Sequence, residues 1–319
     1  MDPICHTLVG AALGSTGLER KTRFGRLTMI LGANLPDVDV ISYGWGETAA
    51  LGFRRGVTHG IPAVLILPLL LAGAMLLLGR RSKPGAPRAT DFKWLLVLSA
   101  ISVASHPALD FLNVYGVRWL MPFDDTWFYG DTLYIVDPWM WAILTLALLF
   151  ARLYRKRNPL PLFKRPATVG LLLAFTYICS MAVASSISRQ VVESELSSTE
   201  ISRFMVAPLP GDPFRRYVVI DGESEYWLGS IELLPRPRFR LGDRVVPKGQ
   251  SPASDRASAT EEGRTFLSWA RFPFFEIDES HDASTVYILD ARYTLSRAAT
   301  FGAVRIPLAA AGTATPTRD

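Results

Sequence analysis

Histidine and aspartate recur through the first 140 residues with spacings that suit a metal site. His106 and Asp110 stand at i and i+4, which places an imidazole and a carboxylate on one face of a helix. Asp37 and Asp39 alternate, so in an extended chain their like charges point the same way and need a cation between them. The other candidate ligands are His6, His59 and Asp131.

Neutral imidazole and carboxylate together favour a divalent metal, Zn²⁺ first, with Mn²⁺ and Fe²⁺ as alternatives. Such a metal lowers the pKa of bound water and polarises a phosphoryl or acyl oxygen. Arg54 and Arg55 precede His59 at the start of an apolar run. Helix N-terminal amides and arginine forks both favour an anion, so we predict that these two arginines hold the substrate.

Each pattern also has a purely structural interpretation. His106 and Asp110 suit a structural pair, and the two alternating aspartates suit a solvated interfacial turn. The arginine pair suits snorkelling to lipid headgroups. His281, in the polar turn Asp-Glu-Ser-His-Asp-Ala-Ser, is expected to be a solvated loop residue.

Long apolar runs must position these residues. The chain has 319 residues, is 49% hydrophobic and has a mean hydropathy of +0.21, more apolar than a soluble protein of this length. Two short runs, His6–Leu18 and Phe24–Leu35, predict a helical hairpin that enters the bilayer partway or packs on the spans. Four runs are long enough to predict spans: Ile61–Gly79, Phe92–Asn113, Tyr134–Tyr154 and Ala167–Ile187.

Basic clusters between these runs predict the orientation. They lie at residues 20–26, 80–93 and 152–165, and the positive-inside rule assigns all three to the cytoplasm. The candidate histidines and aspartates then gather at the outer face. A transporter is disfavoured, because transport sites lie near the bilayer midplane.

The rest of the chain reads differently. Residues 216–221, 225–233 and 284–294 are rich in β-branched and aromatic residues, and residues 248–263 are expected to be a flexible loop. We therefore predict a mainly α fold, with a multi-span transmembrane helical bundle in residues 1–187 and an extracytoplasmic β-rich domain in residues 188–319.

Cysteine content and charge exclude other classes. Cys5 and Cys179 are the two cysteines, so we expect neither a disulfide framework nor a cysteine metal site. The N-terminus lacks a basic region, and a cleaved signal is not expected. The net charge of +5 lies in clusters beside apolar runs, which indicates membrane topology rather than a nucleic-acid surface.

Five stretches carry a resemblance to a known family. In order along the chain, they are residues 2–14, 33–40, 54–60, 105–123 and 128–138. With them the chain resembles the membrane-bound metal-dependent hydrolase family, which is remotely similar to zinc-dependent phospholipase C and P1-type nuclease. The resemblance implies a multi-pass protein of a bacterial-type inner membrane that hydrolyses a phosphoester. The metal ligands it implies are His6, Asp37, Asp39, His59, His106, Asp110 and Asp131.

This chain departs from the family pattern at two positions. Arg54 stands where the family carries histidine, and Gly60 stands where it carries serine. A lost histidine ligand implies fewer metals or an altered substrate clamp.

The leading hypothesis is hydrolysis at the outer membrane face by metal-activated water. The predicted catalytic residues are Asp39, Asp131, Arg54 and Arg55. The expected partners are membrane lipids and a lipid-linked or phosphorylated substrate, without nucleic acid. The alternative is a non-catalytic membrane scaffold or receptor in which the same cluster is a structural metal site.

Overall fold

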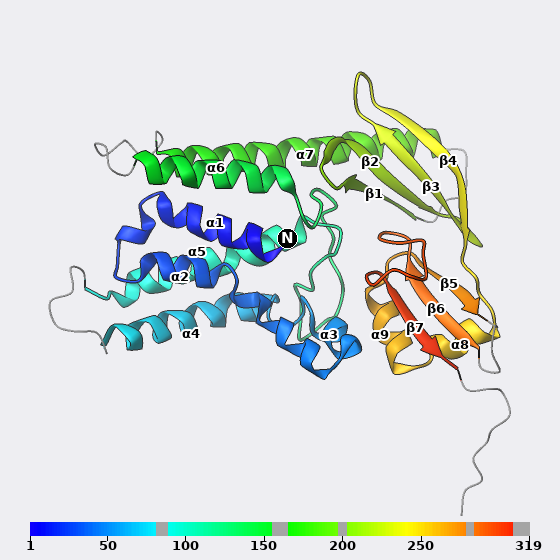
Figure 1. Ribbon diagram of the computed structural model, residues 1–319, viewed down its shortest axis with the longest axis horizontal. Coiled ribbons are helices and arrows are strands. Elements are labelled where there is room, and N and C mark those ends of the chain that lie inside the picture. Colours follow the sequence, from blue (N-terminus) through cyan, green and yellow to red (C-terminus); the bar gives the residue numbers. More distant parts are fainter. Residues whose placement is uncertain (81–88, 155–164, 197–202, 279–283, 309–319) are drawn as a thin grey trace, which may run out of the picture. The chain divides into compact units, whose positions relative to one another are not determined.

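The structure is a computed structural model that describes residues 1–80, 89–154, 165–196, 203–278 and 284–308 (Figure 1). The chain divides into two compact units. The first, here called the membrane unit, comprises Met1–Ser42, Phe53–Ser188 and Ala207–Arg216. The second, here called the β unit, comprises Tyr43–Gly52, Arg189–Val206 and Tyr217–Asp319. The predicted boundary at residue 188 stays a prediction.

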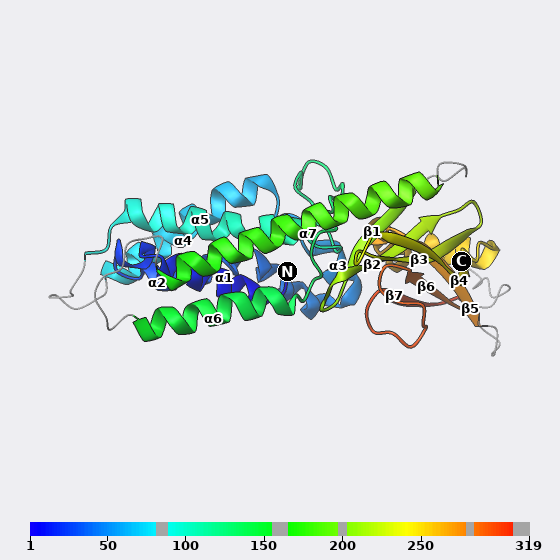
Figure 2. The ribbon, with the colours of Figure 1, turned by 90° about the horizontal axis from the view of Figure 1, so that it is seen from above.

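Three helices of the described chain are long and apolar enough to cross a membrane. They are α4 (Ile61–Arg80), α5 (Phe92–Phe111) and α7 (Pro166–Leu196). They confirm three of the four predicted spans. Figures 1 and 2 show the three helices running in roughly the same direction, with α4 beside α5. The basic clusters at residues 80–93 and 152–165 fall partly outside the described residues.

The remaining predicted span is shorter than expected. Helix α6 covers Pro138–Tyr154, 17 residues, and begins after Asp137 rather than at Tyr134. The Asp137 carboxylate accepts hydrogen bonds from the amides of Trp139 and Met140, both at 3.0 Å, and so caps the helix. Its length is at the lower limit of about 17 residues for a transmembrane helix.

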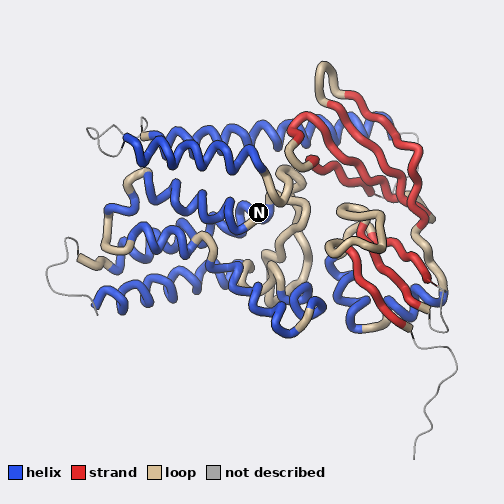
Figure 3. The backbone as a smooth tube through the Cα atoms, in the orientation of Figure 1, coloured by secondary structure: helices blue, strands red, loops and turns tan. Residues whose placement is uncertain are grey.

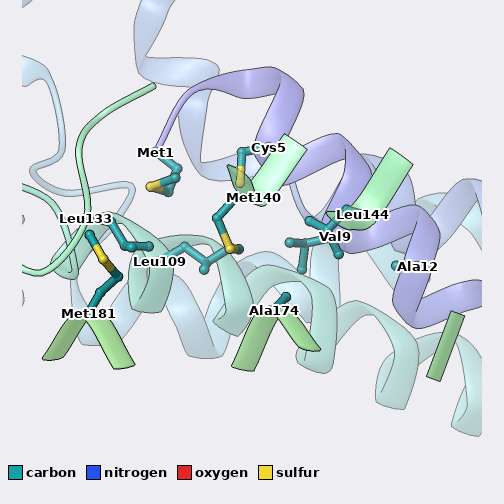
Figure 4. Packing of buried hydrophobic residues seen from close by; sticks show 10 residues of the cluster. All are labelled: Met1, Cys5, Val9, Ala12, Leu109, Leu133, Met140, Leu144, Ala174 and Met181. Atoms are coloured by element: carbon teal, nitrogen blue, oxygen red, sulfur yellow. The ribbon is translucent and has the colours of Figure 1, made fainter. Parts of the chain in front are cut away.

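The two predicted short helices are confirmed. Helix α1 (Pro3–Ser15) packs on α2 (Gly25–Gly32), and both contact α5. A short 3₁₀ turn, η1 (Leu18–Arg20), lies between them. Helix α1 also packs on α6, and these helices share a buried apolar cluster with α7 (Figure 4). The cluster contains Cys5, Val9, Leu109, Met140, Leu144 and Met181. This packing fixes α1 beside the end of α5.

The predicted strands are confirmed within two antiparallel sheets, drawn in red in Figure 3. One sheet has the order β1-β2-β3-β4 and the other β5-β6-β7. Their bounds are β1 Arg203–Leu209, β2 Asp212–Asp221, β3 Glu225–Glu232, β4 Arg238–Pro247, β5 Pro273–Asp278, β6 Thr285–Asp290 and β7 Ala303–Pro307.

The predicted flexible loop at residues 248–263 is wrong. Two helices occupy this region, α8 (Pro252–Ser258) and α9 (Glu261–Trp269). Ser251 caps α8 through a capping box, and Thr260 caps α9. Helix α9 then buries Phe266 and Trp269, so polar capping residues were mistaken for loop composition. His281 lies outside the described residues.

Candidate metal centre

The candidate ligands gather at one end of the helices in the membrane unit. His106 and Asp110 lie in the last turns of α5, and His59 lies two residues before α4. Helices α4 and α5 are packed neighbours joined by a short connection, so the end of α5 lies at the same level as the start of α4. His6 comes from the first turns of α1. Asp37 lies on η2 (Leu35–Trp45), a 3₁₀ helix that follows α2.

The innermost group is formed by His59, His106 and Asp110. Nε2 of His59 lies 3.1 Å from Nε2 of His106 and 3.2 Å from Oδ2 of Asp110. Nε2 of His106 lies 3.5 Å from the same carboxylate oxygen. All three side chains are buried, with at most 1% of their surface exposed.

Neighbouring oxygens fix which nitrogen of each ring carries hydrogen. Nδ1 of His106 lies 2.6 Å from the Ala33 carbonyl, which can only accept, so Nδ1 donates and Nε2 keeps its lone pair. Nδ1 of His59 lies 3.0 Å from the Thr58 hydroxyl, which in turn donates to Oδ2 of Asp39 at 3.3 Å. Burial lowers the pKa of His59 below its usual value and favours the neutral ring.

This arrangement fits a cation. Two imidazole lone pairs and a carboxylate oxygen face one another, and such a group repels itself unless a positive charge lies among them. Zn–N bonds of about 2.0–2.1 Å place two ligands of a tetrahedral ion about 3.3 Å apart, close to the separations seen here. Among the described residues, no hydrogen bond reaches Oδ2 of Asp110. His59, His106 and Asp110 could therefore hold one divalent metal.

Asp37 lies at the open edge of this group. Its Oδ1 is 3.8 Å from Nε2 of His106 and 4.0 Å from Nε2 of His59. The side chain is 14% exposed, in contrast to the buried histidines. Asp37 can therefore complete the coordination, or leave a position for water or substrate.

Two overlapping His/Asp groups have ligand atoms close enough to hold a metal, His6 with His106 and Asp110, and Asp37 with His59 and His106. The His6 ring stacks on His106 at 3.7 Å between centroids, and its Nε2 lies 3.2 Å from Oδ1 of Asp110. The same Oδ1 contacts the Met1 amino group and lies 3.1 Å from Nη2 of Arg55. This side of Asp110 thus faces the Met1 amino group and the Arg55 guanidinium.

Arg55 is buried within the protein. Its guanidinium donates to Oδ1 of Asn113 at 2.9 Å and to the Gly116 carbonyl at 3.1 Å, and lies over the Tyr115 ring. With Asp110, these contacts place Arg55 as an internal support of the site. Its predicted role as a substrate clamp stays a prediction.

Arg54 and Asp39 form a close ion pair beside the metal ligands. Nη1 of Arg54 lies 2.7 Å from Oδ1 of Asp39, and Nη2 lies 3.3 Å from Oδ1 of Asp37. Oδ2 of Asp39 accepts from the Arg55 amide at 2.8 Å. Asp39 thereby orients Thr58 and the His59 ring. Arg54 supplies a positive charge to both aspartates at the position where the resemblance implies a histidine.

Asp131 lies in the segment between α5 and α6. It is buried and has a φ of 46°, and its backbone carbonyl accepts from Ser185 of α7 at 3.1 Å. Among the described residues, it belongs to neither His/Asp group whose ligand atoms lie within 4.8 Å of one another. Its role as ligand or catalyst stays a prediction.

Sequence reasoning did not find two supporting groups, the Ala33 carbonyl and Asn113. A backbone carbonyl carries no signal in residue type. Asn113 lies two residues after α5 and could have been noticed as a polar residue three positions after Asp110.

A comparison with protein families shows which family this chain belongs to. The family model described as YdjM inner membrane protein matches residues 1–191, which include every candidate ligand. The chain belongs to the YdjM inner membrane protein family. This YdjM family chain is also similar to the uncharacterized protein YfhP of Bacillus subtilis (strain 168). The two are 23% identical over 303 residues, covering 92% of this chain and 87% of YfhP. No solved structure matches it.

Proposed function

We propose that this YdjM family chain is a metal-dependent hydrolase of phosphoesters at the outer face of the inner membrane. The observation that carries the proposal is the pair of Nε2 atoms 3.1 Å apart on His59 and His106, both with their Nδ1 engaged by oxygens. A divalent ion held by these nitrogens and Asp110 would lower the pKa of its bound water and polarise the phosphoryl oxygen.

The chain's own residues serve the reaction at the open edge. Asp37 is the candidate ligand carboxylate with the greater exposure, so it is placed to accept a proton from attacking water. Arg54, 20% exposed and 3.3 Å from that carboxylate, is placed to bind the anionic ester. Asp39 holds the Arg54 guanidinium and, through Thr58, the His59 ring. Arg55 supports the site from its contact with Asp110.

The outer-face assignment rests on charge. The connection between α4 and α5 at the end remote from His59 and His106 contains Arg80, Arg81, Lys83, Arg88 and Lys93. The positive-inside rule assigns that connection to the cytoplasm, which supports an extracytoplasmic metal centre and an extracytoplasmic β-rich domain.

Elemental analysis of the detergent-purified full chain tests the proposal. We expect bound Zn²⁺, Mn²⁺ or Fe²⁺ and hydrolysis of bis(p-nitrophenyl) phosphate by the wild type. His106→Ala should lose both metal and activity, whereas His281→Ala, outside the family match, should keep both. Full activity together with full metal content in His106→Ala would refute the role of His106.

Burial favours a second candidate function. The His6, His59 and His106 side chains are at most 1% exposed, which suits a structural metal in a non-catalytic scaffold or receptor. In that case chelation lowers the melting temperature, and no phosphoester or carboxylic ester is turned over. Stoichiometric metal without hydrolysis of either ester class would favour this function.

A further inference from the structure

The 3₁₀ helix η2 has two chemically different edges. Asp39, on the inner edge, is only 7% exposed and faces Arg54 and the His59 segment. Val38, Val40 and Ile41, on the outer edge, are 43%, 52% and 60% exposed. The segment that positions the metal-site carboxylates therefore presents large apolar side chains on its other side.

The outer edge has the composition of a membrane interface. Residues 40–46, Val-Ile-Ser-Tyr-Gly-Trp-Gly, contain no charged residue. Tyr43 and Trp45 in this stretch are 57% and 70% exposed. Tyrosine and tryptophan gather at membrane–water interfaces because one end of the ring is apolar and the other polar.

The segment before α4 and the start of α4 are also exposed and apolar. The Arg55 amide donates to Asp39, which brings the segment before α4 against η2. Phe53 and Val57 of that segment are 60% and 47% exposed, and Ile61, the first residue of α4, is 51% exposed. Further along the same helix Leu65 is 67% exposed.

A loop after α5 adds further exposed apolar side chains near the start of α4. The Ile61 amide donates to the Trp119 carbonyl at 2.9 Å, which places residues 119–123 beside the start of α4. Leu120 and Phe123 in this loop are 40% and 86% exposed. Three segments, η2, residues 53–61 and residues 119–123, thus expose apolar side chains, and the last two meet at the start of α4, two residues after the metal-site residue His59.

We propose that the outer edge of η2, formed by Val38, Val40 and Ile41, inserts into the lipid interface beside the metal centre. The substrate class that follows is an amphiphile with an anionic headgroup, which enters from the bilayer with its chains against η2. Insertion stands on the exposed residues alone, whereas the substrate class rests on the proposed hydrolase function.

Nitroxide accessibility tests the insertion. In a Cys179→Ser background, Ile41→Cys is spin-labelled in the full chain and reconstituted into phosphatidylethanolamine–phosphatidylglycerol vesicles. Leu65→Cys on the span and Thr126→Cys in the exposed loop give the lipid and water references. Collision rates are measured with oxygen, which concentrates in lipid, and with chromium oxalate, which stays in water. Val40→Cys repeats the measurement on the same edge.

We expect the Ile41 and Val40 labels to favour oxygen, as the Leu65 label does. A preference for chromium oxalate like that of the Thr126 label would overturn the insertion. Low accessibility to both reagents would overturn it too, because the edge would then be covered by protein. None of these outcomes depends on hydrolysis, so they are separate from a failure of the proposed function.

A rate comparison tests the substrate class. Ile41→Asp should lower hydrolysis of a long-chain phospholipid in vesicles by about tenfold or more, since a buried isoleucine side chain is worth more than one factor of ten in partitioning. Hydrolysis of soluble bis(p-nitrophenyl) phosphate should not change. An equal loss on both substrates, or no loss on either, would overturn entry from the bilayer.

Discussion

Nε2 of His59 and Nε2 of His106 lie 3.1 Å apart, although the Nδ1 atom of each ring is already engaged by an oxygen. A neutral imidazole carries one N–H hydrogen, and in each ring it lies on Nδ1, so neither Nε2 can donate to the other. Both atoms also lie within 3.5 Å of Oδ2 of Asp110. Without a bound cation, this buried group opposes folding.

Metal removal should therefore lower stability. We expect EDTA to reduce the melting temperature of the detergent-purified protein, and Zn²⁺ at about 100 times its dissociation constant to stabilise it by about 2.7 kcal/mol. His106→Ala, which lacks one of the facing nitrogens, should melt at the same temperature with and without EDTA. An EDTA-insensitive wild type would contradict a structural contribution from metal.

Sequence patterns predicted which ligand candidates share a helix face but not the partners of the arginines. The i,i+4 spacing of His106 and Asp110 predicted a shared helix face, and these side chains do lie together. The charge pattern could not reveal that Arg54 pairs with Asp39 or that Arg55 is buried against Asp110. Those pairings depend on how η2 folds back over residues 54–59. No periodicity in the sequence predicts that fold-back.

Fold prediction failed where local capping competes with composition. Residues 248–263 contain three serines, two glycines and a proline, which is typical of loops, yet Ser251 and Thr260 each satisfy free helix amides. Similarly, Asp137 ends the loop and starts α6 at Pro138. Hydropathy predicted the three long spans, because length and apolar content alone identify a candidate transmembrane helix.

The Asp39–Arg54 pair should be measurable as a coupling. Because Asp39 is 7% exposed and Arg54 lies 2.7 Å away, we expect a double-mutant cycle of Asp39→Asn and Arg54→Ala to give about 0.5–3 kcal/mol, measured by urea unfolding. Asp39→Asn should also weaken metal binding by about 10–100-fold, because it loosens the support of Thr58 and His59.

Asp124→Asn is the matched control for this change, since Asp124 is an exposed loop aspartate that binds the Thr126 amide. It should leave metal affinity unchanged in a competition titration with a chelating dye. Equal affinities for Asp39→Asn and the wild type would show that the Asp39 carboxylate does not support the ligands.

Close packing of α1 on α2 should control the site from a distance. A Cβ at Gly10 would lie 2.6 Å from the Met29 carbonyl and 2.8 Å from Cβ of Ala33, whose carbonyl holds His106. Gly10→Ala should therefore destabilise the protein by about 1–3 kcal/mol and weaken metal binding. The measurements are thermal unfolding and metal titration in detergent.

Gly73→Ala on α4 provides the control, because a Cβ there meets nothing within 4 Å among the described residues. It should leave metal affinity unchanged and shift stability by at most about 1 kcal/mol, toward greater stability. If Gly10→Ala behaves like Gly73→Ala, the helices can separate without moving the Ala33 carbonyl, and the packing does not control the site.

The β unit should lose stability in alkali through the half-buried Tyr217 and the buried Tyr226. Burial raises the pKa of Tyr217 to about 12, and its hydroxyl donates to the Ala291 carbonyl at 3.2 Å. Burial also raises the pKa of Tyr226, whose hydroxyl donates to the Pro273 carbonyl at 2.8 Å. Between about pH 10, the unfolded pKa, and pH 12, the folded state binds more protons than the unfolded state.

The contribution of these tyrosines to stability should therefore be complete below about pH 10 and should fall as the pH rises toward 12. In that range the hydroxyls stay protonated in the folded state but ionise in the unfolded state. The difference in tyrosinate absorbance between wild type and Tyr217→Phe should titrate near pH 12 in the folded protein and near pH 10 in denaturant. The variant should also lose part of the alkaline destabilisation. A folded-state difference centred near pH 10 would mean that water reaches the Tyr217 hydroxyl.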